Sequence, residues 1–95
     1  MTFRIQTSTD KEGVTFMLSG QIDPLGFIEL QRLVERTRNG HPIIFDLSDI
    51  QLVDLFGVRR LAAWERSGIQ LRNCPQYVRD WMLEDDNKRR QFFGR

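Results

Sequence analysis

Three aspartates, Asp23, Asp46 and Asp54, stand where one expected helix or strand gives way to the next. Carboxylates that meet at one end of a sheet bind Mg²⁺ or accept a phosphoryl group, as they do in receiver domains. Asp23 and Asp54 also directly precede expected helices, where a carboxylate accepts hydrogen bonds from free N–H groups and stabilises the helix by about 0.5–2 kcal/mol. We favour helix capping over a metal or phosphoryl site, and we expect no metal ion and no other cofactor.

The single histidine and the single cysteine are the other residues that could carry catalysis or bind a metal. His41 lies in an expected turn with no serine or cysteine close to it in the sequence, so a catalytic triad would need partners from distant parts of the chain, and we favour a solvated loop histidine. One cysteine and one histidine cannot complete a zinc site. The seven glycines form no phosphate-cradling motif. The sequence therefore predicts a protein that is not an enzyme.

Cys74 allows two interpretations. It directly precedes Pro75 at an expected helix start, where free N–H groups lower the pKa of a thiol and make it reactive. A lone cysteine at the end of a strand is more often a small, buried, apolar residue, and we favour that interpretation.

The composition is that of one globular domain over residues 1–95, with a core of about residues 3–83 and a charged C-terminal tail, 84–95. Hydrophobic residues make up 40% and charged residues 28%, which excludes a disordered chain. A net charge of +1 does not favour binding to nucleic acid. No apolar run is long enough to span a bilayer, and the lone cysteine fits a reducing compartment, so we expect a cytoplasmic protein without direct membrane insertion.

The first half of the chain changes from a strand-like to a helix-like spacing of apolar residues. Apolar and polar residues alternate in residues 3–6 and again in residues 14–18, after the turn-like segment 10–13. This pattern predicts a β-hairpin. A helix is expected from Pro24 to about Arg38, because proline suits the first position of a helix. Its inner stripe should consist of Phe27, Leu30, Leu33, Val34 and Thr37.

The second half is expected to supply the centre of the sheet and two further helices. Residues 43–47 are apolar on both faces, which is typical of a strand buried in a parallel or mixed sheet. A second helix is expected over residues 55–67, a strand over residues 69–72, and a third helix from Pro75, followed by the tail as a partly frayed, solvated end. These elements predict an α/β domain with a mixed sheet of about four strands and about three helices packed mainly on one face.

Two segments, Leu18–Asp23 and Phe45–Val58, resemble the STAS domain, the family of anti-sigma factor antagonists and of the C-terminal domains of sulfate transporters. In that family a Gly-x-Ile/Leu-Asp segment leads into the first helix, and a buried strand ending in Asp-Leu-Ser precedes Asp-Ser-Ser-Gly at the next helix. The resemblance extends from about Phe3 to Leu83, and it implies a STAS-like fold that binds a protein partner. The matching residues are Gly20, Asp23, Asp46, Ser48, Asp54 and Gly57.

The chain departs from the family at the position where phosphorylated members carry serine or threonine. That position is Leu55, and the bulky Phe56 follows it, so the acceptor hydroxyl is missing. The resemblance therefore implies partner binding without the phosphorylation switch. Ser48 and Ser67 are the nearby hydroxyls that could substitute, but they are more simply a turn residue and a helix-end residue.

The partner-binding surface is expected at the start of the second helix and on the adjoining part of the first. On the second helix one apolar stripe should face the core, and a second stripe through Phe56, Arg60 and Trp64 is left for a partner, because tryptophan and arginine are common interface anchors. The alternative is that Trp64 packs against a neighbouring helix. The expected partner-binding residues are Asp23, Leu25, Ile28, Asp54, Leu55, Phe56, Gly57, Arg60 and Trp64.

We therefore hypothesise a non-enzymatic protein–protein interaction module, a regulator that resembles anti-sigma factor antagonists. Its expected partner is an anti-sigma factor or a related regulator, and a second copy of the chain is also a candidate partner. The alternative is a small-ligand sensor or a regulatory subunit of a transporter or other larger assembly. Binding assays with candidate ligands and with candidate proteins would separate the two.

Overall fold

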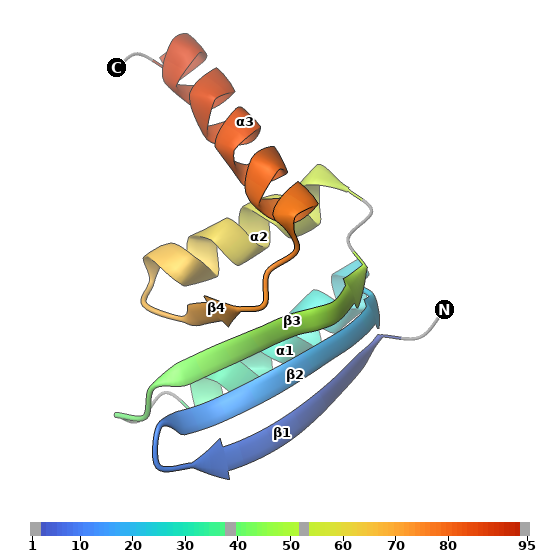
Figure 1. Cartoon of the computed structure of the whole chain (residues 1–95), viewed down its shortest axis with the longest axis vertical. Coiled ribbons are helices and arrows are strands. Elements are labelled where there is room, and N and C mark those ends of the chain that lie inside the picture. Colours follow the sequence, from blue (N-terminus) through green and yellow to red (C-terminus); the bar gives the residue numbers. More distant parts are fainter. Residues whose placement is uncertain (1–2, 38–39, 52–53, 94–95) are drawn as a thin grey trace.

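The computed structural model describes residues 3–37, 40–51 and 54–93 of the chain. The strands of this part form one sheet in the order β1-β2-β3-β4, in which β2 is antiparallel to β1 while β3 is parallel to both β2 and β4 (Figure 1). The described residues thus form an α/β domain with a four-stranded mixed sheet, as predicted. In chain order the elements are β1 (Arg4–Asp10), β2 (Gly13–Gln21), α1 (Pro24–Thr37), β3 (Ile43–Gln51), α2 (Leu55–Arg66), β4 (Gln70–Arg72) and α3 (Gln76–Phe93).

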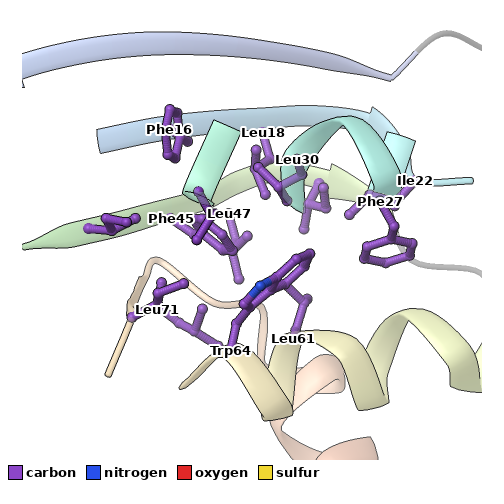
Figure 2. Packing of buried hydrophobic residues seen from close by; sticks show 14 of the residues in the cluster. Phe16, Leu18, Ile22, Phe27, Leu30, Phe45, Leu47, Leu61, Trp64 and Leu71 are labelled. Carbon is purple, nitrogen blue, oxygen red and sulfur yellow. The ribbon is translucent and has the colours of Figure 1, made fainter. Parts of the chain in front are cut away.

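The hydrophobic core lies between one face of the sheet and the helices (Figure 2). Alternate residues of the two central strands point to this face, so the rings of Phe16 in β2 and Phe45 in β3 lie 6.1 Å apart. All three helices contribute to the same cluster, which confirms that they pack on one face. Polar residues such as Gln6 and Asp46 lie on the opposite, open face. The largest fully buried side chains are Phe16, Phe45, Leu18, Leu30, Leu47, Leu61, Val58 and Val78.

β3 is longer than the expected strand of residues 43–47, because it continues through two polar residues to Gln51. Its last residues pair in parallel with the end of β2, where Ser19 is in register with Asp49 and Gly20 with Ile50. Ser48 and Asp49 are exposed and therefore do not interrupt the ladder. A strand with one open face accepts polar residues at such positions, which is why the apolar pattern underestimated its length.

The expectation of a frayed tail after Leu83 is wrong for residues 84–93, which continue α3 to Phe93. The side chains of residues 84–91 are largely exposed, and α3 points away from the sheet (Figure 1). Asp85 accepts a hydrogen bond of 2.9 Å from Arg59 of α2, and Arg90 pairs with Asp86 one turn earlier. Within the described residues no helix combines the length and the apolar character needed to cross a bilayer.

The ion pair between Arg79 of α3 and Glu65 of α2 should make stability depend on pH. Two hydrogen bonds of 2.8 Å join the guanidinium to both carboxylate oxygens, and they lower the pKa of Glu65 below its ordinary value. Such a carboxylate stabilises the fold above its unfolded pKa, and this contribution is lost as the pH falls through its folded pKa.

We therefore expect Glu65→Gln to lower the free energy of unfolding at pH 7 by up to about 1 kcal/mol, a small effect because both side chains are partly exposed. The difference from wild type should shrink as the pH falls below about 5. Urea unfolding of wild type and Glu65→Gln between pH 7 and about pH 4 measures this difference in the free energy of unfolding. A difference that does not change with pH would contradict the role assigned to the pair.

Candidate interaction surface

Two of the three aspartates are helix caps. The Oδ1 atom of Asp23 accepts a hydrogen bond of 2.7 Å from the N–H of Gly26, and the Oδ1 atom of Asp54 accepts one of 2.9 Å from the N–H of Gly57. Asp54 has extended backbone angles, as an N-cap residue should. Both interpretations as caps are confirmed, and both carboxylates remain exposed at the starts of α1 and α2.

Asp46 lies within β3 on the open face of the sheet, and not at the strand boundary that was expected. Its Oδ1 atom accepts hydrogen bonds from the hydroxyl and the N–H of Ser48, at 2.6 and 3.0 Å, and from Asn73. The Ser48 hydroxyl is the main reason why the pKa of Asp46 is lowered. Among the described residues no three His, Cys, Asp or Glu side chains converge as metal ligands would.

Large apolar side chains are exposed at the neighbouring starts of α1 and α2. Leu25 is 76% exposed, Ile28 50% and Phe56 51%, and we call these three residues the helix-start patch. The two helices lie side by side there, because the ring of Phe56 meets that of Phe27 edge-on with centroids 5.4 Å apart. One turn further along, Arg60 of α2 donates a hydrogen bond of 3.4 Å to Gln31 of α1. The structure therefore places the apolar residues that fall off the expected core stripes at two adjoining helix starts.

Trp64 does not belong to the exposed surface, so its assignment as a partner-binding residue is wrong. It is 6% exposed, and its ring lies 5.3 Å from that of Phe45 and 5.8 Å from that of Phe27 (Figure 2). The guanidinium of Arg60 covers the ring from outside at 5.0 Å. The expected second stripe of α2 thus divides into an exposed Phe56 and a buried Trp64. Gly57 is also buried, and its backbone N–H serves the Asp54 cap.

Leu55 faces a different neighbour from Phe56. As a partner-binding residue it was expected to be exposed, but it is only partly so. Its half-buried side chain packs against the core and lines a groove of about 260 Å³ between α2 and α3. Arg59 and Trp81 are other walls of this groove. The salt bridge between Arg59 and Asp85, which fixes one side of the groove, was missed because the two residues are far apart in the sequence and no local pattern joins them.

The remaining two candidates have no role in this surface. Cys74 is partly buried and packs against the core, and burial raises the pKa of its thiol, in agreement with the interpretation as a packed apolar residue. His41 is exposed in the turn before β3, as expected of a loop histidine.

No family model matches the sequence, and a search among curated proteins finds no match. The likeness to STAS domains therefore depends on the quoted residues of β2, β3 and α2 and on the order of the elements.

Proposed function

We propose that this chain is a non-enzymatic, STAS-like interaction module of the cytoplasm, a regulator of the anti-sigma-factor-antagonist type. The observation that carries the proposal is the helix-start patch, in which three large apolar side chains are exposed at two adjoining helices. Exposed apolar residues that gather at one place are typical of protein–protein contacts. The neighbouring Arg60 contacts Gln31 and the Trp64 ring and borders the patch on α2.

The surroundings of the patch define the chemistry of the partner. The exposed carboxylates of Asp23 and Asp54 flank the apolar residues at the two helix starts. The complementary surface is therefore an apolar centre with lysine or arginine side chains opposite Asp23 and Asp54. Each patch side chain that becomes fully buried in the complex contributes up to roughly 1.5–3 kcal/mol.

We expect Leu25→Lys and Phe56→Lys each to weaken binding to the partner by at least about tenfold, because each places a cation against the apolar centre of the partner surface and removes apolar contact area. The matched control is Met17→Lys, which replaces another exposed apolar residue on the open face of the sheet. Isothermal titration against the purified anti-sigma factors of the source cell measures the affinity. Circular dichroism verifies that all variants are folded.

Two outcomes would contradict the proposal that the helix-start patch binds the partner. In one, the patch variants bind as tightly as wild type. In the other, Met17→Lys loses as much affinity as Phe56→Lys. If no anti-sigma factor binds while a small molecule does, the alternative function of a ligand sensor is favoured instead.

We also expect partner binding to be insensitive to phosphorylation. Leu55 has no hydroxyl, and the hydroxyls of Ser48 and Ser67 already donate hydrogen bonds, of 2.6 Å to Asp46 and 2.7 Å to the Trp64 carbonyl. Intact-mass analysis of protein recovered from its native cell should find the unmodified mass in the fraction that binds. Stoichiometric phosphate on Ser48 or Ser67 together with loss of binding would refute this expectation.

A further inference from the structure

The outer edge of β1 is a long, regular and unprotected sheet edge. β1 has seven residues and no neighbour on its outer side among the described strands (Figure 1). Its five central residues, Ile5–Thr9, include no charge, no proline and no glycine. Proteins normally block an exposed edge by one of these means or by keeping it short. The opposite edge, β4, follows that rule with three residues.

The backbone groups that point outward from β1 follow from the β1–β2 register. The N–H of Val14 donates a hydrogen bond of 3.0 Å to the carbonyl of Pro42, away from β1, so the Thr9–Val14 pair is not hydrogen-bonded across the hairpin. Bonded and non-bonded pairs alternate along an antiparallel ladder. The N–H and C=O groups of Ile5, Thr7 and Thr9 therefore point out of the sheet edge.

The charges of β1 are complementary to those of a second, antiparallel β1. Arg4 and Asp10 stand at the two ends of the strand, three residues on either side of Thr7. Both lie on the open face, because they share the side of β1 on which Gln6 is in register with the exposed Met17. An antiparallel pairing centred on Thr7 places each Arg4 opposite Asp10 of the other copy. It also places Ile5 opposite Thr9 and Thr7 opposite itself. The outward N–H and C=O groups of these three residues can therefore all form hydrogen bonds across the pair.

We propose that the chain forms a two-fold symmetric homodimer in which the β1 strands of two copies pair antiparallel about Thr7. The two sheets then join into one continuous sheet with the helices of both copies on the same side. This edge is separate from the helix-start patch, so the dimer does not depend on the proposed function. Registers centred on Gln6 or Ser8 also pair outward backbone groups, but they do not place Arg4 opposite Asp10, and a parallel pairing places like charges side by side.

Thr7→Pro tests whether backbone hydrogen bonds of β1 hold the dimer together. Proline removes an N–H that points outward and leaves the bonds between β1 and β2 intact, whereas the matched control Thr7→Val keeps the N–H. Sedimentation equilibrium from micromolar to millimolar concentration should find wild type and Thr7→Val dimeric where Thr7→Pro is monomeric. Thermal unfolding verifies that Thr7→Pro is folded. Wild type that remains monomeric throughout, or a folded Thr7→Pro that dimerises as tightly as wild type, would overturn the proposal.

A charge exchange tests the register. Arg4→Glu and Asp10→Arg each place like charges opposite each other in the homodimer, so each should dimerise at least about tenfold more weakly than wild type. When the two variants are mixed, the introduced glutamate of one copy faces the introduced arginine of the other, and the unchanged Asp10 and Arg4 also face each other, so a heterodimer should form. Arg36→Glu, the same charge change on α1, should have no effect. Absence of the heterodimer while both variants are folded would exclude the register centred on Thr7.

Discussion

Trp64→Ala should lower the free energy of unfolding by about 3–5 kcal/mol, whereas Phe56→Ala, on the same helix, should lower it by about 0.5–1.5 kcal/mol. Trp64 is 6% exposed and lies between α2, the sheet and α1, where its ring meets those of Phe45 and Phe27. Its removal leaves a cavity that the surrounding rings cannot fill by small movements. Phe56 is half exposed and loses mainly its edge contact with Phe27.

Urea unfolding followed by circular dichroism measures both free energies under the same conditions. Phe56→Ala is the matched control, because it also removes an aromatic ring from α2 at a residue next to Phe27. Equal losses in the two variants would contradict the division of α2 into a buried and an exposed stripe. In that case the helix-start patch would no longer be a free surface.

The distinction between the two residues matters for the proposed function. A partner can bind Phe56 without disturbing the core, but it cannot reach Trp64 without unfolding part of α2. Variants of Trp64 would lose partner binding through loss of the fold, and they are therefore unsuitable for mapping the surface. Variants of Leu25 and Phe56 are suitable, because Leu25 is largely and Phe56 half exposed to solvent.

The predictions that proved right came from local periodicity. The hairpin, the α1 stripe through Phe27 and Leu30, and the buried strand that begins at Ile43 each follow from which residues of one element share a face. The caps Asp23 and Asp54 were predictable for the same reason, since a cap is a contact between residues three apart. The predicted end of α1 at Arg38 lies outside the described residues.

The predictions that failed required knowledge of which elements are neighbours. A helical projection gives α2 two apolar stripes, but it cannot show that α1 and the sheet lie close enough together for Trp64 to contact both. The charged segment after Leu83 was expected to be partly frayed, yet it is helical to Phe93. Its Asp85 is held by Arg59 of α2, a pairing across 26 positions that no local pattern predicts. The edge of β1 likewise became visible only when β2 was found to have β3 on its other side.

Gly13→Ala should lower the free energy of unfolding by about 2–5 kcal/mol, through backbone strain and through a clash at the point where the hairpin meets β3. Gly13 has a φ of +139°, which L side chains rarely adopt. A Cβ atom added there would lie 2.4 Å from the carbonyl oxygen of Pro42. That oxygen accepts the N–H of Val14 at 3.0 Å, so relief of the clash would disturb the first hydrogen bond between β2 and the segment that leads into β3.

Gly40→Ala is the matched control for this prediction. Gly40 also has a positive φ, +80°, but an added Cβ would have no neighbour within 4 Å, so we expect a loss of only about 1–2 kcal/mol from strain. Urea unfolding of the two variants measures the difference. If Gly13→Ala loses no more than Gly40→Ala, the close approach of Pro42 does not restrict this position. If it loses several kcal/mol more, the close approach of Pro42 and the φ of +139°, which is less accessible to L residues than the +80° of Gly40, together require glycine at the start of β2.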